Sequence, residues 1–341
     1  MRIALAGFGV VGQALAKSIA DGRARLRTEY GLDPRLVAVR DSRSLASATG
    51  GLDAEALIQT KKTTNAVGSP LRPGFDPISW AQTVAADVYI DTSPTDLRNP
   101  RPATAGLLAA LGSGKHAITV NKAPLAVAMP ALLENARYNG RMIRFSGTVG
   151  AGTPVLATAT TIARGDTITG VEAILNGTTN YILWLMATSG ATFDSALAEA
   201  QRLGYAETDP GNDVDGFDTA MKLVILANHA MGLATSVDRV SITGIRAVSP
   251  DEIAAASAAG EAVKLIGSIT ASGALSVAPR RVPAASALNV PRNLNAVRFT
   301  LASGGEPTLV GRGAGGPETA TAIVRDLIEI HTAGLARGST C

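Results

Sequence analysis

The fold is set by the first twenty residues, which read Met1-Arg2-Ile-Ala-Leu-Ala6-Gly7-Phe-Gly9-Val-Val-Gly12-Gln-Ala-Leu-Ala-Lys-Ser-Ile-Ala20. An apolar run over 2–6 predicts a strand, and residues 13–20 predict a helix. Between them lies the pattern Gly-x-Gly-x-x-Gly, in the strand–turn–helix context that gives it meaning. The first glycine makes the turn, the second lets the backbone approach a pyrophosphate, and the third allows close helix packing. The sequence therefore predicts a dinucleotide-binding turn, with a purely structural tight turn as the alternative.

Strands and helices keep alternating up to about residue 145. Predicted strands cover 36–40, 88–91, 117–120 and 142–145, and predicted helices cover 102–111 and 124–139. This alternation predicts an α/β fold with a parallel sheet, a Rossmann dinucleotide-binding domain over 1–145. Ligands of such sheets bind beyond the carboxyl ends of the strands, where Thr92, Ser93 and Lys122 lie. An exposed loop lysine is the alternative for Lys122.

The pattern changes after residue 145. A glycine-rich turn leads into a helix with Thr153 as the predicted N-cap and Pro154 at its first position. A strand over 168–175, helices near 176–187, 194–203 and 218–231, and β-rich runs over 240–245, 263–270 and 296–301 follow. They predict a second, mixed α/β (α+β) domain over 146–305. A last glycine-rich turn, 311–319, precedes a helix over 320–331, and we expect the segment 306–341 to return to the first domain.

Composition excludes several classes of function. The 341 residues, 46% of them apolar, are enough for two domains with their own cores. A net charge of +3, only 4% aromatic residues and no basic block argue against a nucleic-acid partner. The one cysteine, Cys341, cannot form a disulfide framework, which fits a cytoplasmic protein. The uncharged run 145–163 is rich in threonine and glycine, so we expect no membrane partner.

The most informative charged segment runs from Glu207 to Lys222, where acids crowd around one lysine. Asp218 and Lys222 lie four residues apart on a predicted helix and so share one face. Carboxylates around an ammonium suit a substrate that carries an amino group and needs a proton delivered nearby. The alternative is a solvated acidic loop with a surface ion pair, worth roughly 0.3–0.5 kcal/mol.

The segment 200–222 resembles the signature of the homoserine dehydrogenases. The match is Ala200-x3-Gly204-Tyr-Ala-x2-Asp209-Pro210-x2-Asp213-Val-x-Gly216-x-Asp218-x3-Lys222. Segments 7–12, 114–123, 148–154, 175–182 and 313–319 agree with the same family, so the resemblance runs from residue 3 to about residue 330. It implies a Rossmann domain, a catalytic and dimerisation domain, and a C-terminal return to the first. We expect a short form without a C-terminal regulatory domain.

The resemblance implies an enzyme that interconverts L-aspartate 4-semialdehyde and L-homoserine, in threonine, methionine and isoleucine biosynthesis. It assigns proton transfer to Lys222, with Lys122 and Asp218 as further catalytic residues. It assigns the substrate to Glu207, Asp213, Asp218 and Lys122, and implies a homodimer or higher homo-oligomer. Two alternatives remain: a related Rossmann oxidoreductase for another amino-acid-derived aldehyde or imine, and a non-catalytic cofactor-binding regulator.

The resemblance and the glycine turn together imply a nicotinamide cofactor. Its predicted contacts are Gly7, Phe8, Gly9, Val10, Val11, Gly12, Arg40, Thr92, Ser93, Lys122, Gly204 and Gly315. Arg40 and Arg43 favour NADP, whereas Asp41 keeps NAD open. The resemblance further implies a monovalent cation, Na⁺, held by backbone oxygens of Val149, Ala151 and Thr153. Ser146 stands where family members often have an acid.

Overall fold

The computed structural model describes residues 1–338, which form two compact units. Unit 1 combines Met1–Gly152 with the chain from Gly315 onward, and unit 2 is Thr153–Ala314. The functional domain boundaries at 145/146 and 305/306 stay a prediction. Within residues 1–338, no helix combines the length and apolar character that crossing a membrane requires.

Unit 1 is built on a seven-stranded sheet in the order β4-β3-β2-β1-β5-β6-β7. The strands β1, β2, β5, β6 and β7 are parallel, whereas β3 and β4 add an antiparallel edge. Their bounds are β1 (Arg2–Ala6), β2 (Arg35–Arg40), β3 (Ser44–Ser47), β4 (Ser69–Pro70), β5 (Val88–Asp91), β6 (His116–Thr119) and β7 (Ile143–Arg144). The strand order reverses between β1 and β5, which is where open α/β sheets bind ligands.

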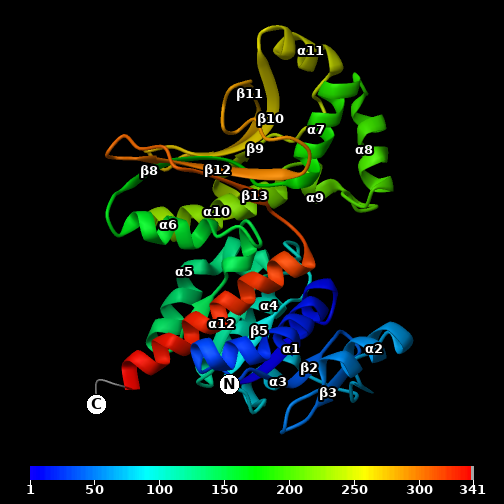
Figure 1. The fold of residues 1–341 in the computed structure, drawn as a ribbon, viewed down its shortest axis with the longest axis vertical. Helices are drawn as coiled ribbons and strands as arrows, with labels where there is room; N and C mark the ends of the chain where they lie inside the picture. Colours follow the sequence, from blue (N-terminus) through cyan, green and yellow to red (C-terminus); the bar gives the residue numbers. More distant parts are fainter. Residues whose placement is uncertain (339–341) are drawn as a thin grey trace. The chain divides into compact units, whose positions relative to one another are not determined.

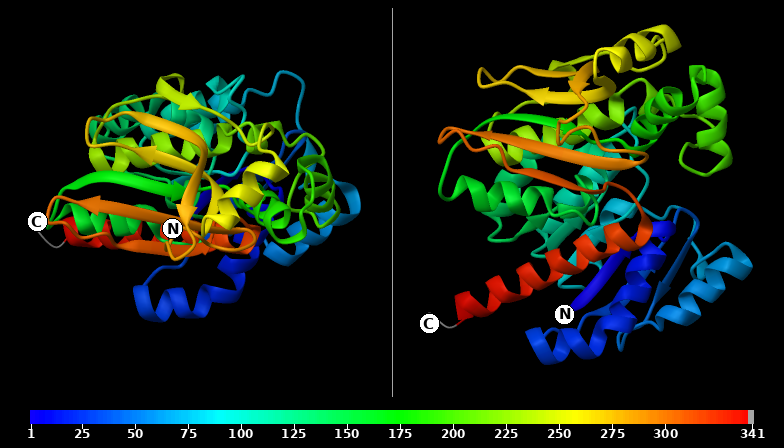
Figure 2. Two further views of the ribbon diagram at one scale, coloured as in Figure 1. Left: turned by 90° about the horizontal axis from the view of Figure 1, so that it is seen from above. Right: turned by 45° about the horizontal axis from the view of Figure 1, so that its top comes forward.

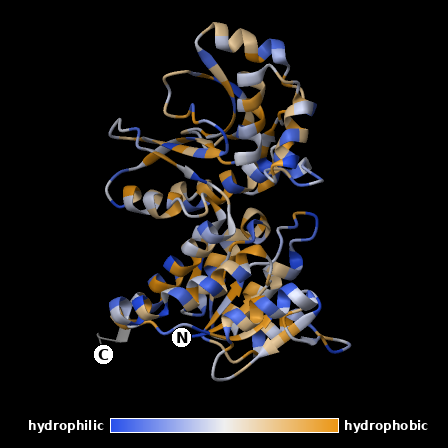
Figure 3. Cartoon of the chain, turned by 45° about the vertical axis from the view of Figure 1, so that its right-hand side comes forward, coloured by the Kyte–Doolittle hydropathy of each residue, from blue (hydrophilic) through white to orange (hydrophobic). Residues whose placement is uncertain are grey.

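Helices cover the sheet of unit 1, and its strands are among the most apolar parts of the chain (Figure 3). The C-terminal helix runs beside the first helix (Figures 1 and 2) and adds Ile323, Leu327 and Ile330 to the core around Ile3, Leu5 and Leu15. The bounds are α1 (Val10–Tyr30), α2 (Ala54–Thr64), α3 (Pro77–Thr83), α4 (Arg101–Gly112), α5 (Lys122–Tyr138), η1 (Ser146–Thr148) and α12 (Gly316–Gly338).

Unit 2 holds a mixed six-stranded sheet in the order β13-β12-β8-β10-β11-β9, in which β9 and β11 are the parallel pair. Gly267 of β10 faces α10, whereas Lys264 of the same strand faces Asn180 of α7, so the sheet separates these helices. The strands are β8 (Ile168–Ile174), β9 (Val240–Ile242), β10 (Glu261–Ile269), β11 (Leu275–Pro283), β12 (Leu294–Leu301) and β13 (Thr308–Arg312). The helices are α6 (Val155–Ala163), α7 (Gly177–Ser189), α8 (Phe193–Arg202), α9 (Gly211–Val214), α10 (Phe217–Met231), η2 (Val237–Arg239) and α11 (Pro250–Ala258).

The α/β fold class and the mixed second sheet are confirmed. Several boundaries were wrong. Helix α1 passes through Gly22 and ends only at Gly31, whose φ of 66° suits a glycine C-cap. Helix α6 begins one residue later than predicted, with Pro154 at the N-cap, and the Thr153 hydroxyl donates to the Arg312 carbonyl instead.

Candidate active site

Lys222 and Asp218 form a buried ion pair in unit 2. Their helix, α10, starts after Gly216, whose φ of 89° favours glycine. The Nζ of Lys222 lies 2.7 Å from Oδ2 of Asp218, and the two side chains are only 9% and 13% exposed. The same Nζ donates to the Leu175 carbonyl, 2.6 Å away, at the end of β8. The pair is therefore not the surface ion pair that the spacing alone permits.

Asn176 joins two carboxylates beside this lysine. Its Nδ2 donates to Oδ1 of Asp213 at 2.7 Å and to Oδ2 of Asp218 at 2.9 Å. Its Oδ1 accepts from the Thr179 backbone at 2.9 Å and so caps α7. Burial, and then the nearby Asp218 carboxylate, raise the pKa of Asp213. Sequence reasoning placed Asn176 at a helix cap but missed this contact, because only folding shows where its Nδ2 points.

The structure leaves Glu207 outside this cluster. Its side chain is exposed, and its carbonyl accepts from Nε2 of Gln201 at 3.0 Å. The loop is also held through Tyr205, whose carbonyl accepts from the Thr178 hydroxyl at 2.7 Å and whose ring centroid lies 4.7 Å from that of Tyr181. The backbone around Glu207 is thus fixed by α7 and α8, while its carboxylate faces solvent.

The glycine turn of unit 1 has the shape that a pyrophosphate requires. A Cβ on Gly7, whose φ is 96°, would lie 2.7 Å from the Thr92 carbonyl, and one on Gly12 would lie 2.5 Å from the Gly7 oxygen. A Cβ on Gly9, by contrast, would meet no atom of the described chain within 4 Å. Gly9 is the N-cap of α1 and offers no side-chain cap, so the helix N-terminus is open to an anion. These residues fit a dinucleotide cofactor.

The ends of β5 and β6 are tied to each other beside this turn. The Thr92 hydroxyl donates to the Gly7 carbonyl at 2.8 Å. Nδ2 of Asn121 donates to the Ser93 hydroxyl at 3.1 Å, and Asn121 also caps α5. Lys122, the first residue of α5, donates its backbone N–H to Oγ1 of Thr95 at 3.3 Å. The structure therefore brings Thr92, Ser93 and Lys122 to the strand ends where the sequence placed them.

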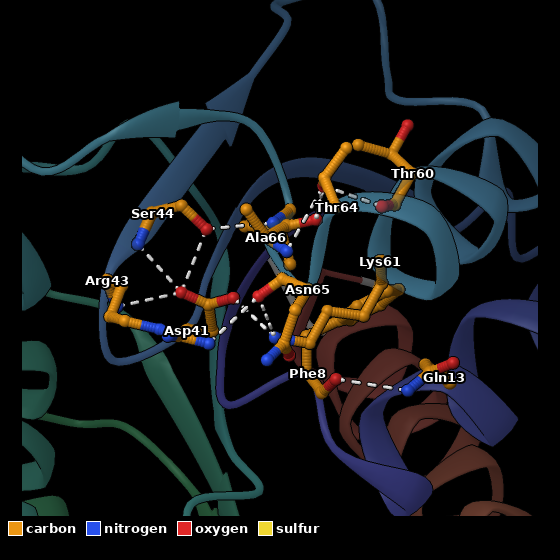
Figure 4. A network of polar contacts seen from close by, with 11 residues as sticks. Phe8, Gln13, Asp41, Arg43, Ser44, Thr60, Lys61, Thr64, Asn65 and Ala66 are labelled. Carbon is orange, nitrogen blue, oxygen red and sulfur yellow. Dashed lines mark hydrogen bonds and ion pairs between the residues drawn. The ribbon is translucent and has the colours of Figure 1, made fainter.

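The end of β2 carries the residues predicted to read the cofactor's ribose. Oδ1 of Asp41 accepts from the Ser44 hydroxyl at 2.8 Å and from the backbones of Arg43 and Ser44, and its Oδ2 lies 2.7 Å from Nζ of Lys61 (Figure 4). Burial tends to raise the pKa of Asp41, but these contacts outweigh it and hold the pKa below its ordinary value. Both carboxylate oxygens are thus engaged within unit 1.

The turn over residues 146–152 is fastened to α12 within unit 1. The Ser146 hydroxyl and backbone N–H donate to the two oxygens of Asp326, at 2.5 and 3.1 Å. Gly150 and Ala151 have φ of 82° and 47°, in the left-handed region. Residues 1–338 hold no group of three or more His, Cys, Asp and Glu side chains suited to a metal. The cation predicted at Val149, Ala151 and Thr153 would use backbone oxygens and stays a prediction.

Two glycines assigned to the cofactor lie outside the turn of α1. Gly315 has φ of 131° and packs so closely on Glu318 that a Cβ would lie 2.0 Å from its Oε2. Gly204, with φ of 75°, follows α8 in unit 2. Their backbone geometry requires glycine with or without a cofactor. Cys341 lies outside the described residues.

Comparisons with known proteins cover both units. Residues 7–146 match the family model described as "Homoserine dehydrogenase, NAD binding domain", and residues 154–328 match "Homoserine dehydrogenase". A homoserine dehydrogenase from Methanocaldococcus jannaschii is 39% identical over 97% of this chain and 98% of its own length. An NAD(+)-dependent homoserine dehydrogenase from Pseudomonas canavaninivorans is also 39% identical, over 97% of this chain and 96% of its own.

Solved structures give the same result. A putative homoserine dehydrogenase from Archaeoglobus fulgidus superposes with a TM-score of 0.89 at 34% identity, over 97% of this chain and 99% of that one. A hyperthermophilic archaeal homoserine dehydrogenase in complex with NADPH gives a TM-score of 0.85 at 29% identity, over 97% and 98% of the two chains.

Proposed function

The chain belongs to the homoserine dehydrogenase family, and from this premise we propose that Lys222 transfers the proton in its reaction. The protein is an NAD(P)-dependent oxidoreductase of amino-acid biosynthesis that interconverts L-homoserine and L-aspartate 4-semialdehyde. The bound nicotinamide accepts or supplies the hydride. The chain's own residues must bind the amino-acid substrate and move a proton at its C4 oxygen.

The observation that supports Lys222 is the geometry of its ammonium group. An ammonium has three N–H donors, and the contacts with Asp218 and the Leu175 carbonyl take two of them. The third is left for the substrate's oxygen. In reduction, that oxygen gains an electron pair as hydride reaches the carbon, and Lys222 gives it a proton. In oxidation, the neutral amine takes the hydroxyl proton back.

The carboxylates around Lys222 have different proposed roles. Asp218 fixes the ammonium from one helical turn away, and Asn176 holds Asp218 and Asp213 side by side. Asp213 orients the lysine or a water molecule beside it. Glu207, on its anchored loop, binds the substrate's ammonium group, since its carboxylate is exposed. Lys122 shares in binding the substrate and in the proton transfer.

We assign the cofactor to the strand ends and the open turn of unit 1. The turn from Gly7 to Gly12, with Phe8, Val10 and Val11, binds the pyrophosphate at the start of α1. Thr92, Ser93 and Lys122 bind the nicotinamide half, and the backbones of Gly204 and Gly315 contact the cofactor as well.

We propose NADP as the preferred cofactor, read by Arg40. A strand-end acid selects NAD by hydrogen bonding the free ribose hydroxyls, but both oxygens of Asp41 already accept bonds from the chain. Arg40 immediately precedes it and supplies a cation for the 2′-phosphate. One relative is named as NAD(+)-dependent and another was solved with NADPH, so the preferred cofactor depends on the residues of each individual protein. Titration calorimetry with each cofactor tests it, and tighter binding of NAD would contradict it.

The role of Lys222 is tested by Lys222→Ala, with Lys17→Ala as the matched control. Lys17 also pairs with an aspartate four residues away, but on the surface of α1. We expect Lys222→Ala to lower kcat by about 10²–10⁴-fold with an unchanged circular dichroism spectrum. Lys17→Ala should leave kcat unchanged. Turnover of Lys222→Ala within a few-fold of the wild type would remove Lys222 from the mechanism.

Three further properties are proposed from the family. The protein is cytoplasmic. It forms a homodimer or a larger homo-oligomer, and sedimentation velocity tests this oligomeric state. Na⁺ binds to the backbone oxygens of Val149, Ala151 and Thr153, with Ser146 in place of an acid. Replacing NaCl by choline chloride at constant ionic strength should then lower activity, and equal activity in both salts would argue against the cation.

A further inference from the structure

The guanidinium of Arg40 rests on an aromatic ring. Its central carbon lies 5.3 Å from the centroid of the Trp80 ring, which belongs to α3. A cation over the face of an indole is attracted electrostatically by the ring, and the attraction strengthens as water is removed from the contact. Both side chains are half-buried, so the contact is partly desolvated. Trp80 therefore restricts where the Arg40 guanidinium can go.

The indole is itself fixed by a second ring. Tyr89 of β5 meets Trp80 edge to face, with centroids 6.0 Å apart and planes at 64°. Tyr89 is buried, and its hydroxyl lies where Gly106 of α4 leaves room: a Cβ there would be 3.1 Å away. Burial raises the pKa of Tyr89 to about 12, so the phenol is neutral. The half-buried indole thus rests against a ring of the core.

The short helix that carries Trp80 is held at both ends. Asp76 caps its start by accepting from the backbones of Ile78 and Ser79, each at 3.0 Å. At its end, Nζ of the buried Lys115 donates to the Gln82 carbonyl at 2.7 Å. A cation is favourable at this end of a helix. The position of the indole is therefore set independently of Arg40.

Arg40 also differs from its neighbour Asp41 in what its side chain binds. The Arg40 carbonyl accepts from the Gly7 backbone at 2.8 Å, which places the residue next to the glycine turn. Its Nε is buried and finds no hydrogen-bond partner within residues 1–338. Asp41, by contrast, has both carboxylate oxygens engaged. At the end of β2, both oxygens of the Asp41 carboxylate are thus engaged, whereas the Arg40 guanidinium, which also interacts with the Tyr89 hydroxyl, keeps one N–H group without a partner in the described part of the chain.

We propose that Trp80 is a positioning residue that sets the preference for NADP over NAD by holding the Arg40 guanidinium for the ribose 2′-phosphate. The proposal rests on the proposed role of Arg40. A phosphate monoester is bound best by a guanidinium that is already in place, because fixing a free arginine side chain costs entropy. NAD has no phosphate at this position, so loss of the indole should weaken NADP alone.

The test compares Trp80→Leu with Trp80→Phe, which keeps an aromatic face. Trp184→Leu is the matched control, since Trp184 carries a similar contact with Arg292, at 5.7 Å, in unit 2. Calorimetry gives Kd for NADP and NAD without turnover, and steady-state assays give KM and kcat. We expect Trp80→Leu to raise Kd and KM for NADP by about 3–30-fold, with kcat and the NAD constants within twofold. Trp80→Phe should lose less, and Trp184→Leu should keep the NADP:NAD ratio of the wild type.

Arg40→Leu separates failure of this proposal from failure of the underlying assignment. If Arg40→Leu abolishes the preference for NADP but neither Trp80 variant changes it, Trp80 has no positioning role and Arg40 still reads the phosphate. If Arg40→Leu leaves the preference unchanged, the assignment of Arg40 fails and the role of Trp80 fails with it. Equal weakening of both cofactors in the folded Trp80→Phe variant would also overturn the proposal. In an Arg40→Leu background, Trp80→Leu should have no further effect on NADP.

Discussion

Two helices within residues 1–338 carry a lysine and an aspartate four residues apart, and only one of these ion pairs is buried. On α1, Lys17 and Asp21 lie 2.9 Å apart with side chains 69% and 63% exposed. On α10, Asp218 and Lys222 lie 2.7 Å apart with side chains 9% and 13% exposed. Spacing and distance are nearly the same, so burial and the neighbouring polar groups make the difference.

The difference arises from the helices that carry the pairs. Every residue of α10 from Asp218 to Asn228 is buried, so its charged pair has no face that points to water. Helix α1 buries one face against the sheet of unit 1 and turns the pair outward. An ion pair in water contributes little, whereas a buried charge that loses its partner is strongly destabilising.

The largest effect is expected from Asp218→Asn, which removes the carboxylate and keeps the shape. The Lys222 ammonium then stays buried without its ion-pair partner: it keeps the contact with the Leu175 carbonyl, and Asp213 is the carboxylate that remains in the cluster. We expect the free energy of unfolding of unit 2 to fall by about 3–5 kcal/mol, and kcat to fall as well. Trp184, the only tryptophan of unit 2, reports urea unfolding of that unit in a Trp80→Phe background. Asp21→Asn is the control, and equally small losses of unfolding free energy in both variants would mean that burial does not distinguish the two ion pairs.

A smaller but pH-dependent effect is expected at Asp326, a buried carboxyl of α12 that bonds Ser146 rather than a lysine. Burial raises its pKa to about 7, so the folded protein keeps this proton at pH values where the unfolded chain loses it. Its stabilising contribution is complete below about pH 3.8 and is lost as the pH rises through about 7. Between these two pH values, the free energy of unfolding of unit 1 should fall by on the order of 2–4 kcal/mol in the wild type relative to the Asp326→Asn variant. Parallel stability curves for the two proteins would show that Asp326 titrates normally.

Lys264 should show a dependence of the opposite sign at alkaline pH. It is buried on β10, where Nζ donates to Oδ1 of Asn180 at 3.0 Å and to the Val290 carbonyl at 2.7 Å. Burial lowers its pKa to about 8, so above that pH the folded protein releases a proton that the unfolded chain retains up to about pH 10.4. The stability of unit 2 should therefore rise by roughly 1–3 kcal/mol over this range relative to Lys264→Gln. The comparison with the variant cancels the other lysines, and a constant difference would contradict the shift.

The smallest effect is expected for the exposed pair itself. Lys17→Met should change the free energy of unfolding of unit 1 by less than about 0.5 kcal/mol. Trp80 reports this unit in a Trp184→Phe background. Any difference should vanish in 1 M NaCl, because salt screens exposed charges. A loss of unfolding free energy above 1 kcal/mol that persists in salt would mean that exposure does not explain the difference between the two ion pairs.

The sequence predicted the central parallel strands because their apolar runs and the glycine turn are local features. It did not predict β11, whose Pro279 and Pro283 argue against a strand. The structure accepts them because β9 pairs only with Leu275–Val277, which leaves the proline-containing part of β11 at a sheet edge on that side. The helices α2, α3, α9 and α11 and the strands β3, β4 and β13 were also missed. The starts of α3 and α11 do carry local signals, since Asp76 and Ser249 are N-caps followed by proline, whereas β3, β4 and β13 have only 4, 2 and 5 residues.

For the site, the sequence predicted that Asp218 and Lys222 share a helical face, which follows from spacing alone. It could not predict that the pair is buried, since burial depends on the strands and helices that surround α10. The double contact of Asn176 depends on bringing residues 176, 213 and 218 together. The engagement of Asp41 likewise needs Lys61, which lies twenty residues further along the chain.

Unit 1 takes its strands from one end of the chain and α12 from the other, and this has a consequence for biosynthesis. When the ribosome has made the first 152 residues, the nascent sheet and α1 still lack Ile323, Leu327 and Ile330. Unit 2 is one continuous segment, so it can fold during translation. The apolar side of α1 stays uncovered during this time, because α12 has not yet been made. We expect chaperones to bind nascent unit 1 throughout that interval and to release it only once α12 has left the exit tunnel.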